Sequence, residues 1–274
     1  MTTTSERPEI GQTVTAAGIS TNYLEAGDGS PVVLVHGSGP GVSAYANWRL
    51  TIPALATEHR VLAPDMAGFG FSAKPGGYGM AGWLDQLDGF LTALGLDRVS
   101  LVGNSFGGGL AIAFADRWPE RVHRLVLMGS VGVSFPITDG LDAVWGYEPS
   151  VENMRRILDV FAHDRSLVTD ELAEIRYRAS VEPGVQEAFS SMFPAPRQRW
   201  VEAMATPEAR IAALPHQTLI VHGREDRVIP LDNALRLLAL IERAQLHVFG
   251  RCGHWTQIEH ADAFNALLLQ FLRG

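Results

Sequence analysis

The chain has 274 residues, of which 46% are hydrophobic and 19% charged, and its formal net charge is −8. A chain of this length can bury one sizeable core with a smaller appended unit, and its acidic balance argues against a nucleic-acid partner. The single cysteine, Cys252, excludes an intrachain disulfide framework. The first eleven residues contain no apolar stretch typical of a signal peptide, and no apolar run approaches the roughly 20 residues that span a bilayer. We therefore expect a cytoplasmic protein with no membrane contact.

The first half of the chain alternates segments typical of strands with segments typical of helices. Short, β-branched apolar runs predict strands, and periodic apolar positions predict helices. We expect strands over 12–16, 21–26, 31–35, 60–63, 99–102 and 122–128, and helices over 83–94 and 110–117. After residue 210 the alternation returns, with strands over 218–221 and 246–249 and helices over 231–240 and 259–272. This order predicts an α/β fold with a mostly parallel eight-stranded sheet covered by helices on both faces.

A different pattern fills the middle of the chain. Residues 151–161, 170–179 and 197–205 have helical spacing, prolines separate the segments, and no run there resembles a strand. In open α/β sheets ligands bind beyond the carboxyl ends of the strands, so a helical insertion at that edge would enclose the site. We expect a core formed by 1–135 and 211–274, and a helical cap, or lid, formed by 136–210.

The segment Gly103-Asn104-Ser105-Phe106-Gly107 matches the pattern Gly-x-Ser-x-Gly. The pattern alone is weak evidence, but here it lies between a buried strand and a glycine-rich helix start, as in a nucleophile elbow. The tight turn would present Ser105 Oγ above the sheet, where the helix dipole favours developing negative charge. The alternative is a serine that only caps the helix.

A serine nucleophile requires a base, and the base requires an acid that orients it. His254 and Asp226 lie in the loops after the last two predicted strands, so both belong to the carboxyl edge of the sheet. We expect Asp226 to accept the Nδ1 proton of His254. Glu225 is the rival acid, and Asp226 could instead pair with a neighbouring arginine at the surface.

The loop 36–41 (HGSGPG) follows the strand predicted over 31–35. Its glycines allow backbone N–H groups to approach a ligand, and we expect the N–H groups of Ser38 and Phe106 to form an oxyanion hole. A phosphate cradle is the alternative, but the chain lacks the G-x-x-x-x-G-K-[ST] pattern and Lys74 is its only lysine. We expect no cofactor and no metal ion.

Several motifs together resemble the meta-cleavage-product hydrolases, enzymes of the α/β-hydrolase fold that break a carbon–carbon bond in ring-fission products of catechols. The motifs are HGSGPG, PDMAGFGFS, GNSFGGG, HGREDRV and CGHW. The stretches FPITDGLDAVWGYEPS, MFPAPRQRW and QLHVFGRCGHWTQIEH are most similar to 2-hydroxymuconic semialdehyde hydrolases, and the resemblance covers essentially the whole chain. It implies a dienoate substrate, hydrolysed to 2-hydroxypenta-2,4-dienoate and a small carboxylic acid, and a homodimer.

The resemblance also implies substrate-binding residues. An asparagine before the nucleophile and a tryptophan after the histidine would bind the carboxylate and 2-oxo end, and further contacts would come from the oxyanion loop and from the pocket for the C6 substituent. The matching positions are Asn104, Trp255, Asn47, Gly39 and Val228.

A cap arginine for the substrate carboxylate is implied as well. Arg197 aligns best, with Arg199 as its rival. Residues 136–210 contain 8 arginines and 13 acidic residues, so the cap would repel an anionic substrate at long range. A short-range arginine–carboxylate bond would then be needed to hold it.

The residues leave the preferred C6 substituent open, and they do not decide whether Ser105 forms an acyl-enzyme or assists the addition of water. Two other functions remain at this stage. A carboxylesterase of the same fold would share the triad, and a ligand receptor could retain it for sensing.

Overall fold

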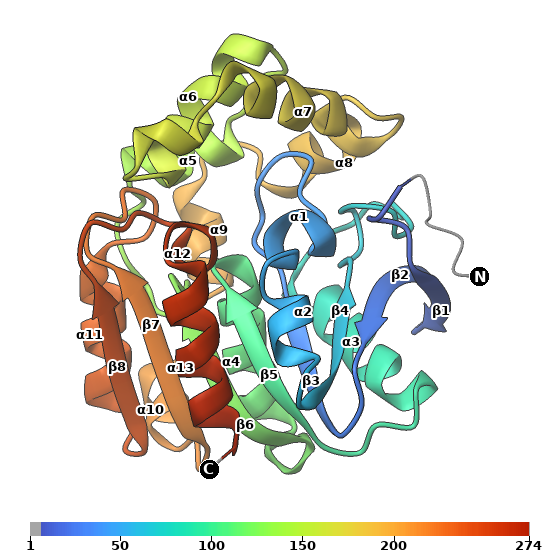
Figure 1. Cartoon of the computed structure of the whole chain (residues 1–274), viewed down its shortest axis with the longest axis vertical. Helices are drawn as coiled ribbons and strands as arrows, with labels where there is room; N and C mark the ends of the chain where they lie inside the picture. The colour runs from blue at the N-terminus through green and yellow to red at the C-terminus, as the bar shows by residue number, and fades with distance from the viewer. Residues whose placement is uncertain (1–6, 274) are drawn as a thin grey trace.

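The computed structural model describes residues 7–273 and contains one sheet of eight strands (Figure 1). The strands lie in the order β1-β2-β4-β3-β5-β6-β7-β8, and only β2 runs against its neighbours. The predicted eight-stranded, mostly parallel sheet is therefore confirmed. The strands are β1 (Gln12–Ala16), β2 (Ile19–Ala26), β3 (Ser30–Val35), β4 (His59–Pro64), β5 (Val99–Asn104), β6 (Val122–Met128), β7 (Gln217–Gly223) and β8 (Ala244–Phe249).

Helices cover both faces of this sheet because its strands are apolar on both sides. In β3, Val33 and Val35 point into one core with α3, α4 and α11, whereas Val32 and Leu34 point into the other with α1, α2 and α13. Alternation along a strand sends successive side chains to opposite faces. These helices and their short neighbours are α1 (Ala44–Trp48), α2 (Ile52–Leu55), α3 (Met80–Ala93), α4 (Phe106–Arg117), α10 (Glu208–Ala212), α11 (Leu231–Leu240), α12 (Thr256–Glu259) and α13 (Ala261–Arg273).

Between β6 and β7 the described chain forms helices and no strand. In Figure 1 most of this helical segment lies above one end of the sheet, over the loop that leads into α1. The α-helices are α5 (Asp139–Trp145), α6 (Val151–Phe161), α7 (Asp170–Ser180), α8 (Val185–Met192) and α9 (Gln198–Ala203). The loops after β3, β5, β7 and β8 open toward this layer, so any site at those strand ends lies beneath it.

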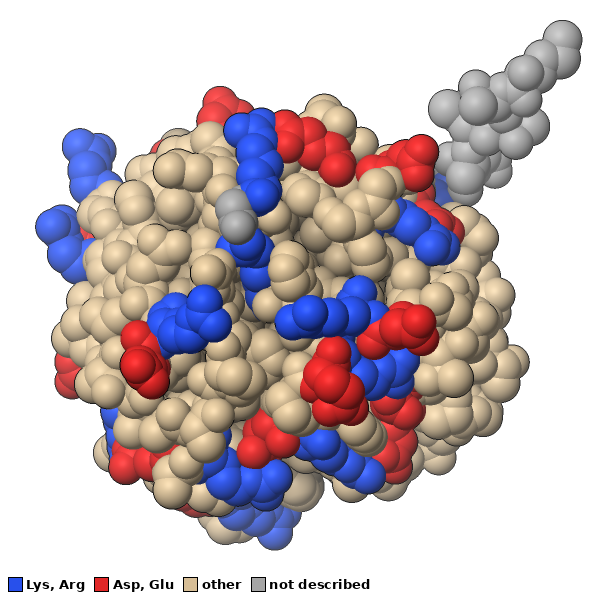
Figure 2. Space-filling view, turned by 90° about the horizontal axis from the view of Figure 1, so that it is seen from below, with Lys and Arg blue, Asp and Glu red and all other residues tan. Residues whose placement is uncertain are grey.

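The opposite face of the molecule carries interspersed basic and acidic side chains rather than a continuous basic surface (Figure 2). Within residues 7–273, no helix combines the length and apolarity needed to cross a bilayer.

Candidate active site

Ser105 occupies a tight turn between β5 and α4. Its backbone has φ 54° and ψ −112°, a conformation that residues other than glycine rarely adopt and that is typical of functional turns. Backbone hydrogen bonds to β6 and to the loop that follows it hold the turn. Ser105 N donates to Met128 O at 2.8 Å, and Val131 N donates to Ser105 O at 3.2 Å. The strand beside β5 thus anchors the strained residue.

The glycines around Ser105 are needed for close packing. A Cβ atom on Gly103 would overlap the carbonyl of Gly107, and one on Gly107 would overlap the carbonyl of Val35. Helix α4 therefore lies directly against β5 and β3, which places the start of the helix beneath the Ser105 side chain.

His254 and Asp226 form a hydrogen-bonded pair. His254 Nδ1 lies 2.7 Å from Asp226 Oδ2, while Asp226 Oδ1 accepts from Val228 N at 2.7 Å and from Ile229 N at 2.9 Å. Burial by itself raises the pKa of Asp226, but His254, the nearby His222 and the Ile229 N–H together lower it, so the pKa lies below its ordinary value. The group is therefore an ionised carboxylate that accepts hydrogen bonds only.

The rival acid, Glu225, faces away from this pair. Its carboxylate accepts from Cys252 N at 2.9 Å and from the Arg224 guanidinium at 2.7 Å. Glu225 thus fixes the loop that carries His254, and Asp226 is the acid that reaches the imidazole.

The helical layer also holds His254 in place. His254 N donates to Phe161 O at 2.7 Å, and the Phe161 ring stacks on the imidazole at a centroid distance of 5.6 Å. A Cβ atom on Gly253 would overlap the same carbonyl, so the glycine allows this approach. The end of α6 and the His254 loop therefore form one packed unit.

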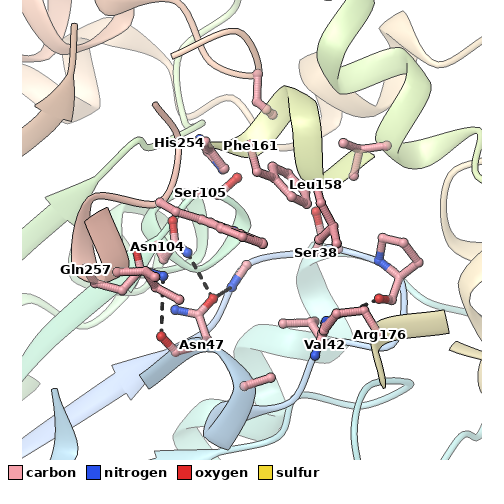
Figure 3. A pocket seen from close by; sticks show the side chains of 18 of the residues that line it. Ser38, Val42, Asn47, Asn104, Ser105, Leu158, Phe161, Arg176, His254 and Gln257 are labelled. Atoms are coloured by element: carbon pink, nitrogen blue, oxygen red, sulfur yellow. Dashed lines mark hydrogen bonds between the residues drawn. The ribbon is translucent and has the colours of Figure 1, made fainter. Parts of the chain in front are cut away.

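Ser105 and His254 line the same cavity, which has a volume of about 140 Å³. Figure 3 shows the imidazole next to the serine, with Asn104, Asn47 and Gln257 on one side. No hydrogen bond joins Ser105 to His254 within residues 7–273. Because Asp226 occupies Nδ1, Nε2 is the nitrogen left for the serine or for a ligand. The same part of the chain contains no group of three or more His, Cys, Asp or Glu side chains that could hold a metal ion.

The loop after β3 contributes Ser38 and Gly39 to the cavity wall. The Phe106 side chain is buried in the core, and its backbone lies at the start of α4. His36 is buried below this loop, where its Nδ1 lies 2.7 Å from Gly37 O and its Nε2 accepts from Met66 N at 2.9 Å. Burial lowers the pKa of His36 to about 4, so this histidine is a neutral structural group.

Two asparagines form the polar end of the cavity. Asn47 Oδ1 accepts from Gly37 N at 3.1 Å and from Asn104 Nδ2 at 2.9 Å, and Gln257 Nε2 donates to the Asn47 carbonyl at 3.3 Å (Figure 3). The Asn47 Nδ2 and Asn104 Oδ1 atoms are buried without a partner. Since buried polar groups normally have one, these atoms mark a place where a polar ligand would complete the network.

The structure does not bring the predicted arginines to the cavity. Arg197 Nη1 lies 3.2 Å from Asp142 Oδ1, and Arg199 lies over the ring of Trp200 at 4.7 Å. Neither side chain lines the cavity wall. The prediction is wrong here because it rests on the position of the arginine in the sequence. That position does not define which face of a helix between β6 and β7 meets the core.

Arg176 of α7 lines the cavity instead, together with Arg49. Burial, followed by the nearby charge of Arg49, lowers the pKa of Arg176 to about 10, so it remains cationic at neutral pH. Within residues 7–273 its one hydrogen bond runs from Nη2 to Pro40 O at 3.4 Å. The spacing of charges in the sequence does not single out Arg176, because Arg197 likewise has no acidic residue at three or four positions on either side.

Apolar side chains form the other end of the cavity. Val228 and Trp255, both predicted to bind substrate, line its wall, and Trp255 stacks on Phe161 at 5.2 Å. The remaining apolar lining includes Leu141, Val144, Met154 and Leu158. The cavity therefore has a cationic, amide-rich end, an apolar end, and Ser105 with His254 on its wall.

Comparisons with known proteins agree with this architecture. The family described as the alpha/beta hydrolase fold matches residues 30–261. The 2-hydroxy-6-oxo-2,4-heptadienoate hydrolase of Pseudomonas putida strain F1 is 64% identical over 98% of this chain and 98% of its own length. The 2-hydroxymuconate semialdehyde hydrolase of Pseudomonas sp. strain CF600 is 62% identical over 97% of this chain and 94% of its own length.

A solved structure is equally similar. The chain superposes on a meta-cleavage product hydrolase from Pseudomonas fluorescens IP01 with a TM-score of 0.97 and 61% identity, covering 97% of this chain and 99% of that one. The similarity thus includes the helical layer between β6 and β7 as well as the sheet.

Proposed function

The chain belongs to the alpha/beta hydrolase fold family and, within it, to the meta-cleavage product hydrolases, and from this premise we propose how its residues divide the reaction. It is a C–C bond hydrolase of the 2-hydroxymuconate-semialdehyde hydrolase type, acting on 2-hydroxymuconate semialdehyde and 2-hydroxy-6-oxoheptadienoate in aromatic catabolism. Water adds across the C5–C6 bond, and the products are 2-hydroxypenta-2,4-dienoate and a carboxylic acid.

The chemistry requires a keto form of the substrate before the bond breaks. Cleavage leaves an electron pair on C5, and a 2-oxo group accepts that pair through the C3=C4 double bond. We assign the proton transfer to C5 to His254 Nε2, because Asp226 holds the opposite nitrogen. The cationic end of the cavity then stabilises the 2-oxo form, whose oxygen gains negative charge as C5–C6 breaks.

At C6, Ser105 acts with His254 as its base. The N–H groups of Ser38 and Phe106 stabilise the negative oxygen that forms when the C6 carbonyl becomes tetrahedral. The serine–histidine hydrogen bond forms when substrate fills the cavity, as catalytic hydrogen bonds often tighten in the Michaelis complex. The observation that carries this assignment is the single cavity that joins Ser105 and His254 to Arg176 at its far end.

The substrate lies with its carboxylate toward Arg176, Asn47 and Asn104. A charge-assisted bond to the guanidinium fixes that end. The C6 substituent then points toward Val228 and the apolar wall. Trp255 and Gly39 pack along the conjugated chain between the two ends. A panel of substrates with hydrogen, methyl or isopropyl at C6 would measure the size preference, since each methylene contributes roughly 1–3 kcal/mol in such a pocket.

An absorbance assay tests the function. The conjugated dienol absorbs in the visible or near-ultraviolet, and its cleavage removes that absorbance. We expect multiple turnovers of 2-hydroxymuconate semialdehyde by the purified protein. Rapid hydrolysis of p-nitrophenyl esters without loss of dienol absorbance would instead identify a carboxylesterase, and tight binding with a single turnover would identify a receptor.

We further propose that residues 136–210 form a cap that closes over a core made of 1–135 and 211–274. Two contacts between these parts support this division: Trp145 Nε1 donates to Ser38 Oγ, and Phe161 O accepts from His254 N. Limited proteolysis with and without a bound dienoate tests it, because a cap that closes on substrate should be protected when the site is filled.

A cytoplasmic homodimer completes the proposal. The single, buried Cys252 fits a reducing compartment, and exposed Leu235, Leu238 and Val248 at the β8 edge offer an apolar face for a second copy. Size-exclusion chromatography with light scattering tests the dimer, and cell fractionation of the native host tests the location.

A further inference from the structure

Trp145 of the cap touches the oxyanion loop directly. Its Nε1 donates a hydrogen bond to Ser38 Oγ at 3.0 Å, and both residues are buried. The two residues are 107 positions apart in the chain. We propose that Trp145 is a positioning residue, which orients the Ser38 hydroxyl as a further donor toward the C6 oxyanion. This inference rests on the proposed function and concerns how its oxyanion hole is assembled.

The donor and acceptor roles of the two groups determine where the Ser38 hydroxyl proton can point. An indole N–H can only donate, whereas a serine hydroxyl has one proton and two acceptor lone pairs. Ser38 Oγ must therefore use a lone pair for Trp145, which leaves its own proton for another partner. Ser38 lines the cavity, and its hydroxyl donates to no other residue within 7–273. The remaining proton is thus available to an oxygen atom bound beside Ser105.

A chain of aromatic rings holds Trp145 and reaches the second proposed donor. Trp145 stacks on Phe193 with centroids 4.4 Å apart and an angle of 11° between the rings. Phe193 contacts Trp83 at 6.4 Å, and Trp83 meets Phe106 edge-on at 4.8 Å. Buried aromatic pairs of this kind resist displacement. The cap therefore contacts Ser38 directly and reaches Phe106 through the core ring of Trp83.

Two further contacts join the cap to the same loop. A Cβ atom on Gly41, where φ is +63°, would lie 2.6 Å from Ser180 N, so α7 packs against the bare glycine. Arg176 Nη2 donates to Pro40 O at 3.4 Å. Residues of the cap thus contact loop 36–41 at Ser38, Pro40 and Gly41.

The test removes the indole N–H and keeps the ring. Trp145→Phe should lower kcat about tenfold, the effect of losing one hydrogen bond of about 1.4 kcal/mol, while KM changes less than about threefold. Stopped-flow absorbance should show slower C–C cleavage and an unchanged rate of ketonisation, because the oxyanion forms only in the later step. A merely structural substitution would slow both steps.

Trp200→Phe is the matched control. Trp200 also lies in the cap, donates from Nε1 to Pro194 O at 2.8 Å and contacts Phe193 at 6.5 Å, but it does not touch the oxyanion loop. We expect this variant to keep kcat within about twofold of the parent.

Ser38→Ala and the double variant complete the experiment. If Trp145 acts through the Ser38 hydroxyl, the double variant should lose no more activity than Ser38→Ala alone. Multiplicative losses, or a Trp145→Phe variant as active as the parent, would overturn the inference. Ser38→Ala also tests the hydroxyl if Trp145→Phe folds poorly. A parent enzyme that fails to bleach any dienol would instead refute the proposed function, so the two failures are distinct.

Discussion

Asp226 Oδ2 lies 2.7 Å from His254 Nδ1 at a position where both side chains are almost fully buried. Burial alone would favour a neutral carboxyl group, but His254, His222 and the Ile229 N–H together lower the pKa of Asp226 below its ordinary value. The pair therefore has a fixed polarity, with the carboxylate accepting and the imidazole presenting Nε2 to the cavity.

Asp226→Asn should lower kcat by about three to four orders of magnitude, because an amide can hold the wrong tautomer of His254. The variant keeps the size of the side chain, so substrate affinity should change little. Steady-state kinetics on 2-hydroxymuconate semialdehyde measure the loss. Glu225→Gln is the control, since Glu225 contacts Cys252 and Arg224 rather than the imidazole, and equal losses in both variants would contradict the assignment.

Ser105→Ala should reduce C–C cleavage by several orders of magnitude and leave dienoate binding largely intact. The carboxylate end of the cavity is formed by other residues, so affinity does not depend on the hydroxyl. Single-turnover absorbance separates the two effects, because ketonisation by His254 should still proceed. A variant that cleaves at the parent rate would exclude the serine from the reaction.

Arg176→Ala should lower kcat/KM about 100-fold, since a charge-assisted bond to a carboxylate contributes up to about 3 kcal/mol. Arg197→Ala should stay within about threefold of the parent, because its guanidinium pairs with Asp142 outside the cavity. Measurement of kcat/KM for both variants on the same substrate compares the two arginines. If Arg197→Ala had the larger effect, the orientation of the bound dienoate would have to be reversed.

The residues on the core strands could be located from the sequence because local rules place them. Ser105 directly follows β5, and Asp226 and His254 lie within a few residues of the ends of β7 and β8. The carboxyl ends of parallel strands meet at one edge of a sheet, so position along a strand is enough to bring such side chains together.

The cap residues could not be located in this way. Arg176 reaches Pro40 across 136 positions, and Trp145 reaches Ser38 across 107. Which face of a cap helix meets the core depends on packing between helices, and amphipathic spacing alone leaves several arginines equivalent. The sequence therefore does not distinguish Arg176 from Arg197, and only the packing of the helices between β6 and β7 does.

Cys252 should resist alkylation in the folded protein at pH 8. Burial raises the pKa of its thiol to about 12, so only about one molecule in ten thousand carries the reactive thiolate. Mass spectrometry after treatment with iodoacetamide should show no label on the native protein and one label after unfolding in guanidinium chloride. Rapid stoichiometric labelling of the native enzyme would mean that the loop beside His254 opens to solvent.

His36 should remain neutral in the folded protein down to pH of about 4, whereas an unfolded chain protonates it near 6.5. Between these values the unfolded state binds more protons, so this group contributes up to about 3 kcal/mol of stability above pH 6.5 that is lost as the pH falls to 4. Burial raises the pKa of Asp65 to about 6, so the stability contributed by Asp65 falls as the pH rises from 3.8 to 6. This change is opposite to that of His36 and partly masks it when stability is measured against pH. A histidine NMR titration isolates His36, and a midpoint near 6.5 would show that burial does not hold the ring neutral.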